Sequence, residues 1–213
     1  MFDFDLMGIV AGLPGLLIAL VFHEYAHARM AVAMGDFTPR IMGRLTLDPR
    51  AHIDPIGLVM LLVARFGWAK PVEYNPMNFR ERTKGEILTA LAGPAANFVT
   101  AFFSLLLLVL LRMFAPGFVT GGVYTVLWMI VIFNINFGIF NLIPLPPLDG
   151  SKVLYHIIPY EHRWRYMQLE RYSFLILIAM MMTPVLGHIL IPLARLILSG
   201  FTFIISLLLG GML

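Results

Sequence analysis

The feature of the sequence that most constrains the fold is Leu16–Met34, an apolar run that carries His23-Glu24-Tyr25-Ala26-His27 near its C-terminal end. The run is about 20 residues long, which is the length that an α-helix needs to cross a bilayer. Positions i and i+4 share one face of a helix, so His23 and His27 are predicted to bind one metal ion side by side. Two imidazoles and a carboxylate cost several kcal/mol to bury at membrane depth unless they are paired, coordinated or hydrated. The run therefore predicts a membrane helix with a metal site.

The composition supports an integral membrane protein. The chain has 213 residues, of which 60% are hydrophobic and 13% are charged, whereas soluble domains are about 45–50% apolar and about 25% charged. No polar stretch is long enough to build a core of its own, so we expect one membrane domain over residues 1–213. The net charge of +3 belongs to loops between apolar segments and does not indicate nucleic-acid binding. Cysteine is absent, so a metal must be bound by nitrogen and oxygen ligands.

The apolar segments predict an all-α polytopic fold. Helices that span the membrane are expected at three places, Leu6–Met34, Ile87–Arg112 and Val123–Leu142. Towards the C-terminus, Tyr172–Leu198 is long enough to span, although Pro184, Gly187 and Pro192 interrupt it, and Phe201–Leu213 is too short for a confident span.

Three segments outside these spans are expected to differ from a membrane helix. Ile56–Phe66 is too short to span and is interpreted as re-entrant or interfacial. Gly67–Tyr74 has two aromatic residues, a proline and no helical period, which predicts a short extended β segment at the interface. The rough alternation of Ile41–Leu47 indicates a short strand.

The distribution of basic residues predicts the orientation. Lys and Arg are concentrated between Arg29 and Lys84 and again between Lys152 and Arg171, whereas the N-terminal tail has none. By the positive-inside rule both basic regions lie in the cytoplasm, so the N-terminus of this multi-pass cell-membrane protein is expected outside. The tail lacks the basic region of a signal peptide, so we expect the first apolar segment to be retained. The His-Glu motif then falls towards the cytoplasmic side.

A second motif supplies a carboxylate at the same depth. Asp149 follows a proline-rich stretch, Pro144-Leu145-Pro146-Pro147-Leu148, that cannot form regular helix. Two histidines, one carboxylate and an open position for water form a catalytic arrangement for one Zn²⁺ ion. Glu24 can then take a proton from water at the metal and pass it to the leaving amine. The alternative role for Asp149 is to cap the helix that begins at Gly150-Ser151.

Two asparagines are weaker candidates. Asn97 and Asn141 lie in predicted membrane helices and can donate to an oxyanion beside the metal. Their alternative role is hydrogen bonding between helices. His52 is interpreted as a surface or supporting residue, and no role is assigned to His156, His162 or His188.

The two metal motifs resemble the paired signature of site-2 protease intramembrane zinc metalloproteases. The resemblance rests on His23-Glu24-Tyr25-Ala26-His27 and on the stretch from Asn141 to Gly150, and it extends to Gly93-Pro94-Ala95-Ala96-Asn97 and Gly67-Trp68-Ala69-Lys70-Pro71-Val72. It implies a three-helix catalytic core over about 8–160, followed by C-terminal helices over about 171–213. It also implies His23, His27 and Asp149 as zinc ligands and Glu24 as catalytic base. The chain shows no PDZ-like insert and no C-terminal nucleotide-sensing domain, as in compact prokaryotic members.

The function expected from this resemblance is regulated intramembrane proteolysis, in which peptide bonds of transmembrane or membrane-adjacent substrates are hydrolysed within the lipid bilayer. The alternative is a membrane metal transporter that uses the His/Asp site for transit. A transporter would not need Glu24 beside the histidines, and transporters often have duplicated halves. The sequence shows no internal repeat.

A helical substrate must unwind before its peptide bond becomes accessible, and the freed backbone groups need partners in the membrane. Strand addition supplies such partners in many peptide-binding proteins. We therefore expect substrate binding along residues Gly67, Trp68, Ala69, Lys70, Pro71 and Val72. The alternative is an interfacial anchor in which Trp68 lies among lipid headgroups.

Overall fold

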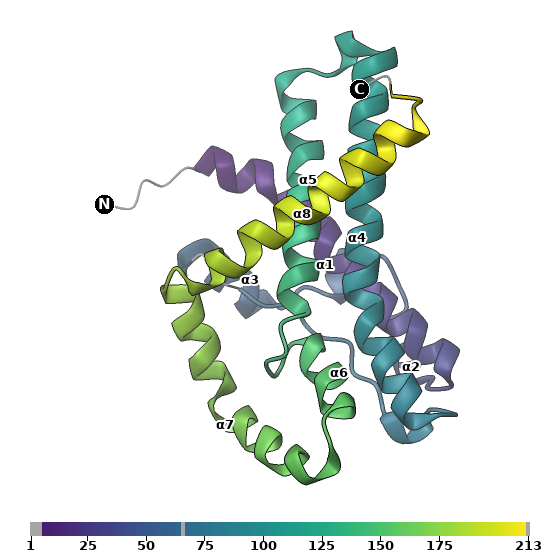
Figure 1. Cartoon of the computed structure of the whole chain (residues 1–213), viewed down its shortest axis with the longest axis vertical. Coiled ribbons are helices and arrows are strands. Elements are labelled where there is room, and N and C mark those ends of the chain that lie inside the picture. Colours follow the sequence, from purple (N-terminus) through teal and green to yellow (C-terminus); the bar gives the residue numbers. More distant parts are fainter. Residues whose placement is uncertain (1–5, 65–66, 212–213) are drawn as a thin grey trace.

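The computed structural model describes residues 6–64 and 67–211, and within them the fold is all-α, as predicted (Figure 1). In chain order the α-helices are α1 (Leu6–Met34), α2 (Thr38–Ile41), α3 (Pro55–Ala64), α4 (Arg82–Phe114), α5 (Gly121–Asn141), α6 (Asp149–Ile157), α7 (Tyr160–Met182) and α8 (Val185–Leu208). Short 3-10 turns are η1 (Pro49–Ala51), η2 (Pro76–Asn78) and η3 (Pro116–Phe118).

Three long helices form the core. α1, α4 and α5 pack on one another in all three pairs, and Figure 1 shows α4 and α5 upright with α1 passing behind them. Small residues allow the close approach: a Cβ atom on Gly15 of α1 would lie 2.8 Å from the backbone of Met129 in α5. Close packing at small residues is a usual way to associate helices in a bilayer, where the lipid competes for apolar contacts.

Among the residues that the structure describes, four helices are long and apolar enough to span a membrane. They are Gly12–Met34 within α1, and α4, α5 and α8 in full. The prediction of a multi-pass membrane protein is therefore confirmed. Side chains of α8 are almost entirely unburied along its span, which is the pattern of a helix whose surroundings are lipid.

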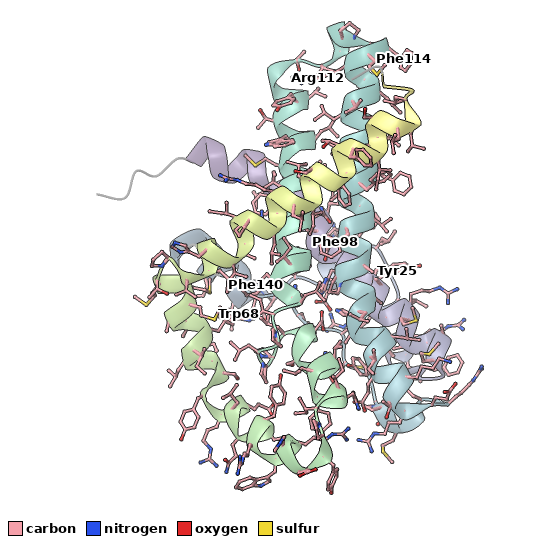
Figure 2. The ribbon with its side chains drawn as sticks, viewed as in Figure 1. Tyr25, Trp68, Phe98, Arg112, Phe114 and Phe140 are labelled. Carbon is pink, nitrogen blue, oxygen red and sulfur yellow. The ribbon has the colours of Figure 1, made fainter. Side chains whose placement is uncertain are left out.

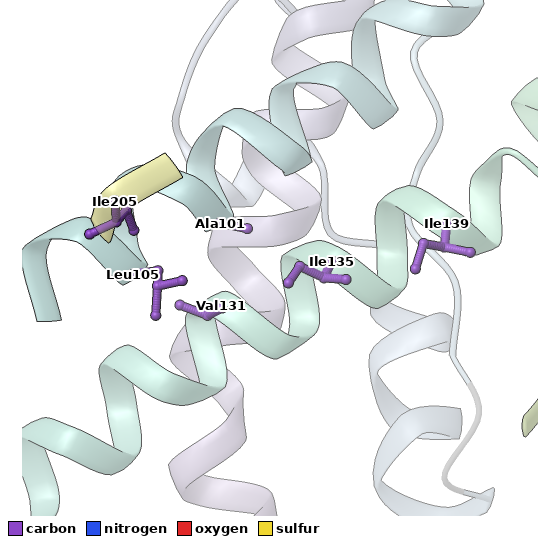
Figure 3. Packing of buried hydrophobic residues seen from close by; sticks show 6 residues of the cluster. All are labelled: Ala101, Leu105, Val131, Ile135, Ile139 and Ile205. Atoms are coloured by element: carbon purple, nitrogen blue, oxygen red, sulfur yellow. The ribbon is translucent and has the colours of Figure 1, made fainter. Parts of the chain in front are cut away.

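A buried apolar cluster joins α8 to the core. Ile205 of α8 belongs to a buried cluster with Ala101 and Leu105 of α4 and with Val131, Ile135 and Ile139 of α5, and it lies beside Leu105 in Figure 3. α8 crosses in front of α4 and α5 at this point (Figure 1). The cluster joins α8 to the α4–α5 pair through apolar contacts alone.

The C-terminal helices differ from the prediction. The expected span Tyr172–Leu198 is wrong, because the chain breaks at Thr183-Pro184 between α7 and α8. A proline disfavours helical conformation in the residue before it, and Thr183 is extended with ψ of 163°. α7 begins already at Tyr160, so the C-terminal helices do not begin at 171. The first half of α7 is polar and exposed, so hydropathy does not reveal its start.

The short segments agree with the prediction only in part. The strand predicted over Ile41–Leu47 is wrong, because α2 and a turn occupy this region, with Gly43 at φ +69°. The predicted short segment Ile56–Phe66 largely coincides with the ten-residue helix α3, which begins one residue earlier at Pro55, and the last two residues of the predicted segment lie outside the described part of the chain. Residues 67–75, hereafter the extended segment, are non-helical as expected. Their β character is limited, in the described residues, to one antiparallel bridge between Ala69 and Ile53.

Asp36 ties the end of α1 to the chain that leads into α4. Its buried carboxylate accepts hydrogen bonds from the backbone and hydroxyl of Thr38, from the backbone N–H of Asn75 (2.6 Å) and from the amide of Asn78 (2.8 Å). Burial acts to raise the pKa of Asp36, but the bonds from Asn78, Thr38 and Asn75 outweigh it and hold the pKa below its usual value. Asp36 thereby fixes the end of the extended segment against α1.

We expect Asp36→Asn to destabilise the protein by about 1–3 kcal/mol, because the new amide group faces a backbone donor. The aspartate of an unfolded chain titrates near pH 3.9. Stabilisation by Asp36 is therefore complete above that pH and is lost as the pH falls through the lower pKa of the folded state. The measurement is the thermal unfolding midpoint in detergent between pH 7 and pH 3, which should depend less on pH in Asp36→Asn than in the wild type. Exposed Asp48→Asn is the control, and equal acid sensitivity of Asp36→Asn and wild type would contradict the assignment.

Candidate active site

The structure brings three predicted metal ligands together. His23 and His27 lie one turn apart on α1, and their Nε2 atoms are 2.9 Å apart. Oδ2 of Asp149, the first residue of α6, lies 3.1 Å from Nε2 of His23 and 3.0 Å from Nε2 of His27. All three side chains are buried. Residues more than 120 positions apart in the sequence therefore meet at one point.

Hydrogen bonds fix how the imidazoles face this point. Nδ1 of His27 lies 2.7 Å from the backbone oxygen of Thr89, and Nδ1 of His23 lies 2.7 Å from Oδ1 of Asn97. Since both partners are oxygen acceptors, each Nδ1 carries the proton. The Asn97 amide group donates to the oxygens of Ala19 and Asn134, which sets Oδ1 of Asn97 towards His23. Each Nε2 consequently presents a lone pair to the other two ligand atoms.

The three facing atoms fit a divalent metal ion. Nε2 of His23, Nε2 of His27 and Oδ2 of Asp149 are all acceptors, and Oδ2 has no hydrogen-bond donor within the described residues. A single proton can form a hydrogen bond between only two of these acceptors, whereas one metal cation can bind all three. Metal–ligand bonds of about 2.0–2.2 Å in a tetrahedron put the ligand atoms about 3.3 Å apart, close to the separations found here. Two nitrogens and one oxygen form a donor set that suits zinc.

α4 makes room for the imidazoles. A Cβ atom on Gly93 would lie 2.4 Å from Nε2 of His27 and 2.6 Å from the ring of His23. Thr89, Gly93 and Asn97 are spaced by four residues and share one face of α4. On that face the Thr89 carbonyl contacts His27 and the Asn97 amide contacts His23. Gly93, between them, has no side chain and so leaves room for both rings.

Asp149 does not act as a helix cap. The N-cap of α6 is Leu148, without a side-chain cap, so the alternative role considered for Asp149 is wrong. The preceding loop is anchored by Leu145 and Leu148, which pack with Leu177 of α7. α6 itself packs against α4, and this packing places Asp149 beside the two histidines of α1.

One face of α6 carries two further polar contacts. Lys152 and His156 follow Asp149 at i+3 and i+7. Nζ of Lys152 lies 3.4 Å from Oδ1 of Asp149, and Nε2 of His156 lies 2.5 Å from Oε2 of Glu86 on α4. Burial acts to lower the pKa of Lys152, but Tyr74 and Asp149 raise it above its usual value, so the side chain is an ammonium ion at neutral pH.

Glu24 links the site to the extended segment. The side chain is buried, and its Oε2 accepts a hydrogen bond of 2.9 Å from the backbone N–H of Val72. Further along, the N–H of Lys70 donates to the backbone oxygen of His52 (2.9 Å). His52 is fully buried, and its Nε2 lies 2.8 Å from the backbone oxygen of Thr46. The extended segment is therefore held beside Glu24 by its own backbone donors.

The other predicted site residues are placed differently. Asn97 donates both amide hydrogens within the protein and supports His23, so in this arrangement neither hydrogen is free for an oxyanion. Asn141 donates to Phe137 in its own helix and is not part of the cluster. Gly67, Trp68, Ala69, Lys70 and Pro71 lie along the extended segment before Val72. The oxyanion role of both asparagines and the substrate role of residues 67–72 stay predictions.

The polar contacts around the ligands were not predicted from the sequence. They are made by Lys152, by the Glu86–His156 pair and by the carbonyl of Thr89. The spacing of Lys152 and His156 from Asp149 is a helical signal that could have identified them. The Thr89 carbonyl carries no such signal, because every residue has one.

Comparison with known proteins places the chain among putative zinc metalloproteases. The profile of Peptidase family M50 matches residues 112–184, which include Asp149. The chain is 36% identical over 182 residues to the putative zinc metalloprotease YwhC of Bacillus subtilis, covering 83% of this chain and 82% of that protein. It is 31% and 30% identical to the putative zinc metalloproteases Rip2 of Mycolicibacterium smegmatis and Mycobacterium tuberculosis, with 83% and 82% of this chain and 68% of each relative covered. No solved structure matches the chain significantly.

The relatives align over most of their length and of this chain, and the apolar helices enclose a buried donor set that suits zinc. The chain therefore belongs to Peptidase family M50, the site-2 protease family of membrane zinc metalloproteases.

Proposed function

We propose that this protein is a zinc endopeptidase that hydrolyses transmembrane or membrane-adjacent peptides within the bilayer, and that residues 1–213 act as one membrane domain. The observation that carries the proposal is the set of three facing acceptors from His23, His27 and Asp149. Gly93, which lies against both histidines, is eleven residues into the membrane helix α4. The charged start of α4 ends at Glu86, so at 1.5 Å per residue Gly93 lies about 9 Å beyond Ile87, where the apolar part of the helix begins, and this depth is within the hydrocarbon.

The proposed roles follow from the contacts. His23, His27 and Asp149 hold the metal, and the histidines are oriented by Asn97 and Thr89. When bound, zinc would act as a Lewis acid and lower the pKa of a coordinated water molecule to about 7. Glu24 takes the proton of that water and later gives it to the leaving amine. The N–H of Val72 holds the carboxylate of Glu24 in position through Oε2.

Glu24→Gln tests the general base. Glutamine can still accept the hydrogen bond from Val72 but cannot take a proton, so we expect cleavage to fall about 10²–10⁴-fold with full zinc content. Purified protein is incubated with membrane-spanning peptides, with and without a chelator, and zinc is measured by metal analysis. Asp149→Ala should instead lose zinc, and exposed His162→Ala serves as the control. Cleavage by Glu24→Gln at the wild-type rate would rule out the assignment.

We also propose that the active site lies towards the cytoplasm. Arg80, Arg82 and Lys84 lie at the start of α4, the end nearer to Gly93. Arg112 and Phe114 mark the opposite end of α4, remote from α6 (Figure 2). The positive-inside rule assigns the basic end to the cytoplasm.

Cysteine labelling measures this orientation, and the chain has no cysteine of its own. Gly117 and Arg80 are both exposed at opposite ends of α4. Gly117→Cys should react with an impermeant thiol reagent added to intact cells, whereas Arg80→Cys should react only after the membrane is opened. The reverse labelling pattern would place the active site near the outer face.

The extended segment is proposed to bind the unwound substrate. The N–H groups of Lys70 and Val72 donate to the His52 carbonyl and to the Glu24 carboxylate. Successive residues of a strand direct their N–H groups to opposite edges, so Ala69 and Glu73 face the other edge. The N–H groups of Ala69 and Glu73 have no acceptor in the described part of the chain. The edge with Ala69 and Glu73, which ends before the Asn75 N–H that Asp36 accepts, thus has donors that can pair with a substrate backbone that would otherwise be unsatisfied in the membrane.

Glu73→Pro removes one free donor and leaves the Val72–Glu24 bond in place, whereas proline at position 72 would disturb the base as well. We expect weaker cleavage of intact transmembrane substrates with normal zinc content. A short peptide that is already extended should be cleaved nearly as before, because it needs less help to stay unwound. Glu73→Ala keeps the N–H and is the control. Undiminished cleavage of both substrates by Glu73→Pro would leave the segment as an interfacial anchor.

A further inference from the structure

Lys152 places a positive charge against the outer oxygen of Asp149. Its Nζ lies 3.4 Å from Oδ1 of Asp149, while Oδ2 of the same carboxylate faces Nε2 of His23 and of His27 at 3.1 and 3.0 Å. The two oxygens of Asp149 therefore have different environments. One faces nitrogen lone pairs and the other faces an ammonium group.

A second contact holds Lys152 in this place. Nζ lies 5.2 Å from the centroid of the Tyr74 ring, within the range of a cation–π interaction. Tyr74 stacks on Phe79 with ring centroids 5.6 Å apart. The ammonium group is thus held between α6, which carries Asp149, and the extended segment, which carries Tyr74. The Lys152 side chain is 39% exposed, so these contacts, more than enclosure, define where it lies.

The number of Asp149 oxygens that bind the metal matters for the reaction. A carboxylate can bind a metal through one oxygen or two, and a second bound oxygen would fill a coordination position. A catalytic zinc site keeps one position open beside three protein ligands. An ammonium group next to Oδ1 competes with the metal for that oxygen, because it forms a charge-assisted hydrogen bond with it.

We propose that Lys152 is a positioning residue that reserves Oδ1 of Asp149, so that Asp149 binds zinc through Oδ2 alone and one coordination position stays open. The inference rests on the proposed role of Asp149 as a ligand. It explains why a lysine lies one turn after the ligand on the same face of α6. It also connects the metal to the extended segment through Tyr74.

Lys152→Met tests the inference, since it removes the charge and keeps most of the side-chain length. Lys152→Arg keeps the charge. Lys84→Met is the matched control, because Lys84 is 60% exposed and pairs with Glu81 away from the site. Each full-length protein is purified in detergent and stripped of metal. It is then titrated with Co²⁺, whose visible absorption is strong in four-coordinate sites and weak when the coordination number rises. Zinc affinity is measured by competition with a chelator, and kcat and KM are measured on one membrane-spanning peptide.

In Lys152→Met we expect a weaker cobalt absorption, a zinc affinity equal to or higher than that of the wild type, and a kcat lowered about 10–100-fold with little change in KM. Lys152→Arg should restore most of the absorption and of kcat. A zinc affinity that falls together with kcat in Lys152→Met would overturn the inference, because Lys152 would then only hold α6 in place. Unchanged cobalt absorption would also overturn it, whatever happens to kcat.

Asp149→Ala separates this inference from the proposed function. If Asp149 is a ligand, Asp149→Ala loses zinc affinity, and the Lys152 variants then decide the inference by themselves. If Asp149→Ala binds zinc as tightly as the wild type, the proposed ligand set is wrong and the inference falls with it. The two failures therefore give different metal-binding results.

Discussion

Three acceptors that face one another inside an apolar bundle are the constraint on which this structure depends. Nε2 of His23, Nε2 of His27 and Oδ2 of Asp149 lie within about one hydrogen-bond length of each other, and without a cation between them their lone pairs repel. Burial of such groups at membrane depth is costly unless they are coordinated. The second hydrogen bond of each imidazole, to Asn97 and to Thr89, offsets part of this cost, and a bound metal ion would offset the rest.

α4 does more than pack against the helix that carries the histidines. In successive turns of one face, the Thr89 carbonyl contacts His27, Gly93 leaves room for both imidazoles, and the Asn97 amide contacts His23. Asn97 in turn is held by Ala19 of α1 and Asn134 of α5. All three core helices therefore contribute to the orientation of one imidazole. A change in how these helices pack would therefore change the orientation of His23 in the candidate metal site, through this chain of hydrogen bonds.

The extended segment is coupled to α1 at two points. Glu24, within α1, accepts a hydrogen bond from the backbone N–H of Val72. Asp36, just beyond the end of α1, accepts one from the backbone N–H of Asn75. Both are carboxylates that bind backbone N–H groups of a segment that has almost no ladder of its own. The segment can therefore keep a free edge and still hold a defined position beside the proposed base.

The sequence by itself determined the membrane helices of the core, the pair of histidines and the carboxylate motif, because hydropathy and helical spacing are local properties. It did not determine the break between α7 and α8 or the start of α7, where a polar helix follows a loop. Only the tertiary structure decided that Asn97 supports His23, that Val72 contacts Glu24 and that Lys152 lies between Asp149 and Tyr74. These contacts join residues from separate segments, and their geometry depends on how the helices cross, which no local pattern records.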